Sequence, residues 1–241
     1  MVMRKTAAGW AAALGALAAV SGAVASPITF SATFGSRAAQ ATFDTSGSDL
    51  VITLQNTSSA DVFQPDQILT ALFFDVSGPA LGLTRTSAVV PPGSTTWFGI
   101  TDPGGVVGGE WAYVEQLVGA PLGAAYGISS TGLGLFGPGD VFPGSNLQGP
   151  ASPGGLEYGL TSTADNTVTG NTPVTGSYAL VQDTVVFTLS GLPGGFDPSQ
   201  AIRNVVWQYG TSLTETRLPE PGSLALLCAA GLLVARRRPR S

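Results

Sequence analysis

The sequence predicts an all-β fold, a β-sandwich-like exported domain with long Gly/Pro-rich loops, and three observations support this prediction. Short segments rich in Val, Ile, Thr and Phe recur through residues 26–217. Gly, Pro, Asn and Asp separate these segments, and Gly alone accounts for 33 of the 241 residues. The only plausible helix, at 110–118, is closely flanked by Gly and Pro. Many short strands joined by turns are typical of a β-sandwich.

The expected strands follow one another along the chain. Residues 28–34 alternate between apolar and polar side chains, and they are placed to pair with 40–43 across a turn at Gly35. Residues 68–76 are strongly apolar, which predicts a central strand. The remaining predicted strands are 50–54, 97–100, 110–115, 184–189 and 205–209.

Residues 119–176 differ from the rest of this domain because Gly, Pro, Ser, Thr and Asn dominate them. We expect long loops here, with a few short strands such as 156–160. Loops of this length are usually either functional or linker-like, and the composition leaves both interpretations open.

The charge of the middle part excludes one class of partner. Residues 26–217 carry four Arg, no Lys and fourteen Asp or Glu, which gives a net charge of −10. Nucleic-acid binding requires clustered basic side chains. We therefore expect no nucleic-acid partner and a solvated acidic surface.

Residues 1–25 have the order of a secretory signal peptide. Basic residues precede an apolar run over 7–20, and small residues follow it. Ala23 and Ala25 fit the A-x-A cleavage rule. We therefore expect Ser26 to become the N-terminus after export through a Sec-type machinery.

Residues 218–241 fall into three parts. Leu-Pro-Glu-Pro-Gly occupies 218–222, an apolar stretch covers 223–235, and a basic tail fills 236–241. The apolar stretch spans about 20 Å as a helix, against a hydrocarbon core of roughly 30 Å. Snorkelling Arg side chains and local thinning of the bilayer absorb this mismatch. We expect a single transmembrane helix with a cytoplasmic anchor formed by Arg236, Arg237 and Arg238.

Pro219, Glu220 and Pro221, followed by the apolar stretch and the Arg cluster, resemble the PEP-CTERM sorting signal of exosortase substrates. The resemblance covers only residues 218–241. It implies a Gram-negative-type bacterium, transient anchoring in the inner membrane, cleavage near the motif by a membrane-embedded exosortase, and delivery to the cell surface or extracellular matrix. The Leu-Pro-x-Thr-Gly signal of sortases is also similar, but Pro221 replaces its Thr, which argues against cell-wall anchoring.

Side chains for catalysis are scarce. The chain has no His, and Cys228 lies in the apolar C-terminal stretch, so the sequence excludes Ser-His-Asp, Cys-His and His-ligated metal sites. Glu110 and Glu115 offer a carboxylate pair of the glycosidase type. Outward carboxylates beside inward aromatic residues on a strand explain this pair better. We therefore expect no catalytic residue, no cofactor and no enzyme activity.

Calcium is the metal that the loop carboxylates suit, because it prefers hard oxygen ligands. None of these carboxylates belongs to a D-x-[DN]-x-[DN]-G loop, and Asp in a turn more often caps its own backbone. We therefore commit to no metal site. The calcium candidates are Asp102, Asp140, Asp165 and Asp197.

Together these features predict a structural or adhesive protein of the cell surface or extracellular matrix. The alternative is a carbohydrate-binding module, with or without the help of calcium, whose partner would be an extracellular polysaccharide. That alternative rests on the loop acids and on aromatic residues, which either stack on sugars or fill the core. These aromatic residues are Trp97, Trp111, Tyr113, Tyr126, Tyr158, Trp207 and Tyr209.

Overall fold

Two β-sheets form the framework of the chain. The computed structural model describes residues 25–222, except 100–103, 140, 143, 149–155, 173 and 177. Within these residues α1 (Pro198–Ala201) is a four-residue α-helix, and Pro221 and Gly222 at the end of the described part are also helical. The other helical turns are the 3-10 turns η1 (Pro65–Gln67), η2 (Gly108–Glu110) and η3 (Pro121–Gly123). The prediction of an all-β fold is confirmed.

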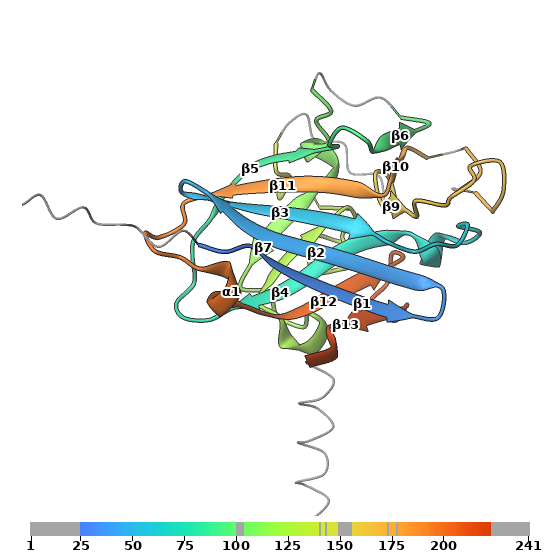
Figure 1. Cartoon of the computed structure of the whole chain (residues 1–241). Coiled ribbons are helices and arrows are strands. Elements are labelled where there is room, and N and C mark those ends of the chain that lie inside the picture. The colour runs from blue at the N-terminus through green and yellow to red at the C-terminus, as the bar shows by residue number, and fades with distance from the viewer. Residues whose placement is uncertain are drawn as a thin grey trace, which may run out of the picture.

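The first sheet is antiparallel throughout. Its neighbouring strands lie side by side across the front of the molecule in Figure 1. Hairpins join the first three, and the tight turn at Gly35 needs its left-handed φ of 61°. In spatial order the strands are β1 (Ile28–Phe34), β2 (Arg37–Ser46), β3 (Asp49–Asn56), β11 (Thr184–Ser190) and β5 (Thr84–Val89).

The second sheet is less regular. Its main path contains β13 (Arg217–Pro219), β12 (Ile202–Tyr209), β4 (Leu69–Val76), β9 (Leu160–Thr161), β10 (Leu180–Gln182) and β6 (Thr95–Trp97). A hairpin of β7 (Ala112–Glu115) and β8 (Tyr126–Ser129) pairs with β4 through β8. The strand β4 therefore lies in the middle of this sheet, as its apolar sequence predicts.

A hydrophobic core lies between the two sheets. Alternate residues of β2, β3 and β11 are completely buried in it, together with side chains of β4 and β12. Phe43 of β2 meets Phe74 of β4 edge to face, with ring centroids 5.1 Å apart. Trp111 contacts Phe187 of β11 in the same way at 4.9 Å. Burial of each such ring contributes about 1.5–3 kcal/mol, so these contacts hold the two layers together.

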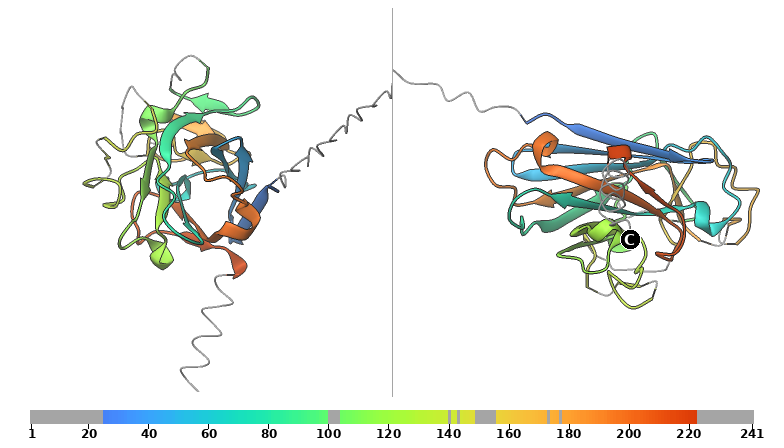
Figure 2. Two further views of the ribbon diagram at one scale, coloured as in Figure 1. Left: turned by 90° about the vertical axis from the view of Figure 1, so that its left-hand side faces the viewer. Right: turned by 90° about the horizontal axis from the view of Figure 1, so that it is seen from below.

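A second apolar cluster covers the outer face of β4. It is built by residues 117–125, 130–139 and 141–142, which we call the loop cover. Phe136 of the loop cover packs on Phe73 of β4 with ring centroids 6.0 Å apart. In the left view of Figure 2 the green segment lies on the side of the molecule away from the blue strands. Both faces of β4 are therefore buried, which explains its almost uninterrupted apolar sequence.

Three local predictions need correction. The strand expected at 156–160 shrinks to β9, because residues 156–158 form a turn in which Tyr158 has a φ of 57°. The strand expected at 97–100 lies earlier, at β6, and ends where Phe98 takes a φ of 55°. The possible helix at 110–118 is wrong, because η2 leads directly into β7.

No helix among the described residues is long and apolar enough to cross a membrane. The expected signal peptide up to residue 24 and the expected transmembrane helix at 223–235 lie outside these residues.

Candidate functional site

The predicted processing residues meet the fold at its two ends. Ser26 is exposed and lies just before β1, next to a partly buried Ala25. At the other end Pro219 and Glu220 are partly buried and Pro221 is exposed. Ala23 and the anchor residues Arg236, Arg237 and Arg238 lie outside the described residues.

The start of the motif is part of the second sheet. In β13, Leu218 pairs with Trp207 and Pro219 pairs with Val206. Leu218 is only 1% exposed and belongs to the core between the sheets. The burial of Leu218 therefore holds β13 on the domain more firmly than the pairing of a short edge strand would by itself.

A β-bulge in β12 lies opposite the end of β13. The register against β4 shifts by one residue between Arg203 and Val206. At the bulge Asn204 has a φ of 55°, a conformation that Asn tolerates better than most residues. Its side-chain amide donates to Asp75 Oδ2 at 2.9 Å and to the carbonyl oxygen of Leu122 at 3.3 Å. These two hydrogen bonds fix the orientation of the bulged backbone.

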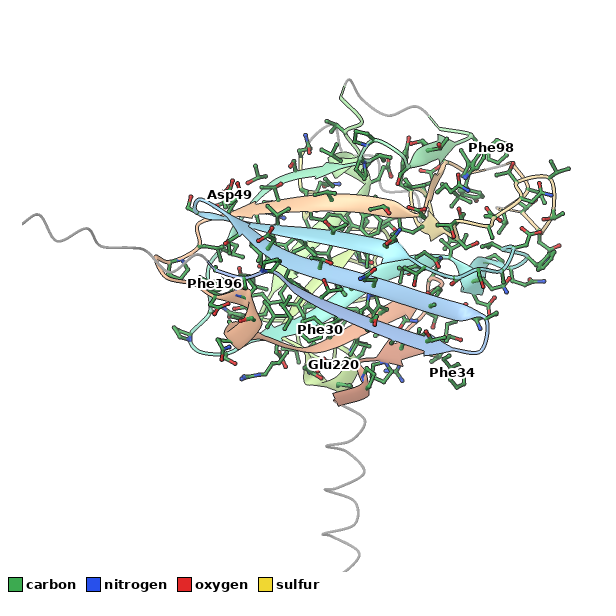
Figure 3. The ribbon with its side chains drawn as sticks, in the orientation of Figure 1. Phe30, Phe34, Asp49, Phe98, Phe196 and Glu220 are labelled. Carbon is green, nitrogen blue, oxygen red and sulfur yellow. The ribbon has the colours of Figure 1, made fainter. Side chains whose placement is uncertain are left out.

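Glu220 closes this end of the sheet. Its backbone N–H donates to the carbonyl oxygen of Val205 at 2.9 Å. Its carboxylate Oε1 accepts the backbone N–H of Asn204 at 3.2 Å. We call Asn204, Val205, Pro219 and Glu220 the sorting junction, and Figure 3 shows Glu220 at the short turn below the strands. The junction ties the central residue of the predicted motif to the folded domain by two hydrogen bonds.

The calcium candidates separate in the structure. Asp102 and Asp140 lie outside the described residues. Asp197 caps α1 by accepting the backbone N–H of Ser199 at 3.0 Å, which is a structural role. Asp165 is the remaining candidate and is 8% exposed.

Asp165 lies beside Asp61, a loop residue that is not among the calcium candidates. The Oδ1 atoms of both carboxylates accept the same backbone N–H, that of Val62, at 3.1 Å for Asp165 and 3.0 Å for Asp61. The carboxylate of Asp61 also accepts the backbone N–H of Asn166 at 2.8 Å and the hydroxyl of Thr169. This carboxyl pair joins the loop after β3 to the loop after β9.

The two carboxyl groups differ in their acidity. Hydrogen bonds from Thr169 and from the backbone of Asn166 hold the pKa of Asp61 below its ordinary value. Burial raises the pKa of Asp165 to about 6, and the neighbouring Asp61 contributes to the shift. Oδ2 of Asp165 is buried and has no hydrogen-bond partner within the described residues. An ionised Asp165 is therefore unfavourable in this position.

Neutralising charge for this pair is missing from the described residues. The one ion pair recorded there joins Arg37 to Asp66 at 2.8 Å. No group of three or more Asp, Glu, His or Cys in the described part of the chain is placed to hold a metal ion. Because calcium takes six to eight oxygen ligands, the carboxyl pair by itself does not make a calcium site.

The carboxyl groups of Glu110 and Glu115, on either side of residues 111–114, are held within the fold. Glu115 accepts the backbone N–H groups of Leu83 and Gly82 at 2.7 and 3.0 Å, and the hydroxyl of Tyr113 at 2.7 Å. Glu110 is 7% exposed at the end of η2. Glu115 thus fastens the loop before β5 to β7, which accounts for its position without a substrate.

The aromatic residues that suggested a carbohydrate platform fill the interior. Trp111, Trp207 and Tyr209 are completely buried, while Tyr113, Tyr126 and Tyr158 are at most 9% exposed. The seventh, Trp97, is partly buried and packs against a small apolar cluster that includes Ile68 and Leu180. A pocket of about 660 Å³ lies beside β5 and β6. Neither an aromatic nor a charged side chain occurs among the described residues that line it, which are Val89, Val90, Pro91, Pro92, Ser94, Thr95, Thr96, Gly99, Gly104 and Gly105.

Sequence reasoning missed two residues, Asn204 and Asp61. Asn204 lies inside a strand pattern and only its pairing reveals the bulge. Asp61 is separated from Asp165 by 104 positions, and an Asp beside Ser and Ala is an ordinary loop signal. Comparison of the chain with protein-family models, curated proteins and solved structures found no match.

Proposed function

We propose that this chain is an exported protein of the cell surface or extracellular matrix, with a structural or adhesive role and no catalytic activity. One observation carries the proposal: the strands fill the interval between the two predicted processing sites. The first strand, β1, begins at Ile28, two residues after Ser26, and the last, β13, ends at Pro219 within the motif. Removal of residues 1–25 and of the residues after Pro219 would therefore leave every described strand in place.

The folded part has what an independent exported domain needs. Its sheets enclose a continuous apolar core, so stability does not depend on disulfide bonds, and residues 26–217 contain no Cys. Its net charge of −10 favours a solvated state outside the cell.

The two terminal segments account for how the domain is exported and then released at the cell surface. The signal peptide directs the chain to a Sec-type export machinery. The apolar stretch at 223–235 then holds the chain in the inner membrane, with residues 236–241 on the cytoplasmic side. An exosortase that recognises Pro219, Glu220 and Pro221 would release the domain from this anchor. Each proline favours an extended backbone in the residue before it, here Leu218 and Glu220, and an extended peptide is the form that a processing enzyme binds.

Cell fractionation of the native host tests this route. We expect the wild-type domain in the surface or matrix fraction, without its C-terminal tail. Replacing Arg236, Arg237 and Arg238 together by Ala should leave the domain in the membrane fraction or misoriented, because the anchoring charge is lost. The matched control is Arg85→Ala, since Arg85 is an exposed Arg of the domain with one hydrogen bond to the backbone. Recovery of the intact wild-type chain from the cytoplasm would refute the proposal.

A further inference from the structure

We propose that the peptide bond broken during sorting lies on the C-terminal side of Glu220, so that Glu220 remains with the mature domain and anchors its last strand. The inference rests on the proposed function, because it places the cut of the same processing step. The motif would then have two parts. Pro219 and Glu220 belong to the folded domain, and Pro221 begins the segment in which the chain is cut.

The residues before Glu220 are poor substrates because they are paired and buried. Arg217, Leu218 and Pro219 lie opposite Gln208, Trp207 and Val206 of β12. A processing enzyme must enclose several extended residues around the bond that it cuts. At Leu218 this would require the side chain to leave the core between the sheets, where it is 1% exposed. Cleavage within β13 therefore requires local unfolding first.

Glu220 itself is held by one hydrogen bond to its carboxylate and one from its backbone N–H. The bulge turns the N–H of Asn204 towards Oε1 of Glu220, and the backbone N–H of Glu220 reaches the carbonyl oxygen of Val205. The side chain of Asn204 is held by hydrogen bonds to Asp75 and to the carbonyl oxygen of Leu122, so the bulge that presents this N–H is fixed by the domain itself. The junction therefore holds the chain in place up to Glu220.

The chain becomes accessible immediately after this point. Pro221 and Gly222 are both exposed, and they are helical and outside the sheet, so rearranging them does not disturb the core. A Cβ atom added to Gly222 would come no closer than 3.9 Å to any neighbouring heavy atom, the nearest being Oε1 of Glu220. Cleavage here breaks one peptide C–N bond: the acyl group passes to water or to an amine acceptor, and the new amine leaves with the C-terminal segment. The folded domain is not disturbed by this step.

Mapping the C-terminal peptide of the mature protein from its native host tests the position of the cut. We expect a terminus at Glu220 or later, without residues 236–241. A terminus at Arg217, Leu218 or Pro219 would overturn the inference and leave the proposed function standing. A terminus at Ser241 would instead overturn the proposed function, and the inference with it.

Amide hydrogen exchange tests the junction without depending on processing. The full-length chain is produced in a host without an exosortase and purified in detergent. We expect the amides of Asn204 and Glu220 to exchange at least about tenfold more slowly than that of Gly222. Glu220→Ala should remove the protection at Asn204, and Glu220→Gln should restore much of it because an acceptor oxygen remains.

The matched control is Asp44→Asn, which alters an exposed carboxylate in β2 that, among the described residues, accepts only the N–H of the next residue, Thr45. This variant should leave exchange at Asn204 unchanged. Equal exchange at Asn204 in wild type and in Glu220→Ala would mean that the carboxylate does not hold the junction, and the inference would be wrong.

Discussion

The two faces of the molecule are built in different ways. The five-stranded sheet is antiparallel, hairpins join β1, β2 and β3, and its one register shift lies between β11 and β5. Its inward residues alternate with outward ones along β2, β3 and β11. On the far side, the loop cover closes the outer face of β4 with irregular backbone and few paired residues. Phe136 and Phe142 are nevertheless as well buried there as many residues of the core between the sheets.

The comparison shows that a segment can be well buried without forming regular strands. A strand pattern marks the five-stranded sheet because one face of it is buried, which imposes a period of two residues. The loop cover has no such period, since its apolar residues reach the sheet from turns. Its Gly-rich composition suggests a mobile surface loop, yet its packing is that of a core. We therefore expect substitutions in both regions to reduce the free energy of unfolding. The size of the loss should depend on how buried the side chain is, and not on whether it lies in a regular strand.

The largest expected effect is at Phe74, the ring that both packs on Phe43 and stacks on Tyr126 at 5.4 Å. Phe74→Ala should lower the free energy of unfolding by about 3–5 kcal/mol. Phe136→Ala in the loop cover should cost about 2–4 kcal/mol, because this ring is also buried. Urea unfolding of the mature protein measures both. A loss below about 1 kcal/mol for Phe136→Ala would show that the loop cover contributes little to the stability of the domain.

A pH-dependent effect is expected at the carboxyl pair. Burial raises the pKa of Asp165 to about 6 from an ordinary value of 3.8. Its stabilising contribution is complete below the ordinary value and is lost as the pH rises through about 6. We expect the wild-type protein to lose about 1–3 kcal/mol between pH 4 and pH 8 through this group. Urea unfolding across this range measures the loss.

Asp165→Asn should remove most of this pH dependence, while Asp44→Asn should keep the wild-type slope. The lowered pKa of Asp61 acts in a more acidic window, where stability is lost as the pH falls, so it does not obscure the measurement. An unchanged slope in Asp165→Asn would contradict the assignment. Addition of calcium at pH 8 should have little effect, and a large rise in stability would indicate a metal site instead.

A smaller effect is expected at Gly127 of β8, where the loop cover approaches the sheet. A Cβ atom there would lie 2.7 Å from Leu117, 2.8 Å from Phe136 and 3.0 Å from Phe73. Gly127→Ala should therefore cost about 1–3 kcal/mol through overpacking. Gly194→Ala is the matched control, since a Cβ at Gly194 meets nothing within 4 Å. Equal melting temperatures of the two variants would show that the cover is not closely packed.

The smallest effect is expected at Asp197, the cap of α1. Asp197→Ala should cost about 1 kcal/mol, and Asp197→Asn only a fraction of that, because Asn also accepts the N–H of Ser199. Thermal unfolding with and without a chelator measures both variants. A chelator-dependent loss of stability that disappears in Asp197→Asn would restore Asp197 as a calcium ligand.

The sequence predicts the regular half of this fold better than the irregular half. The apolar segment at 68–76 is a central strand because both of its faces are covered, and the alternation at 28–34 marks a half-buried strand. The strand β5 was missed because its first three residues are exposed and polar, which removes the alternation. The very short β10 and β13 offer too few residues for any period.

The candidate sites were predicted less completely, for a physical reason. Pro219 and Glu220 stand in a recognisable order along the chain, so a motif reveals them. Their contact with Asn204 depends on a bulge, which is a property of the pairing of two strands and not of either sequence. The pairing of Asp61 with Asp165 likewise depends on how two distant loops meet.

The intact mass of the protein purified from its native host tests the central claim most directly, because both processing steps change it. Our account predicts a species that begins at Ser26 and lacks the basic tail from Arg236 to Ser241. A species that begins at Met1, or one that keeps the tail, would contradict the proposal that this β-domain is exported and released from a membrane anchor.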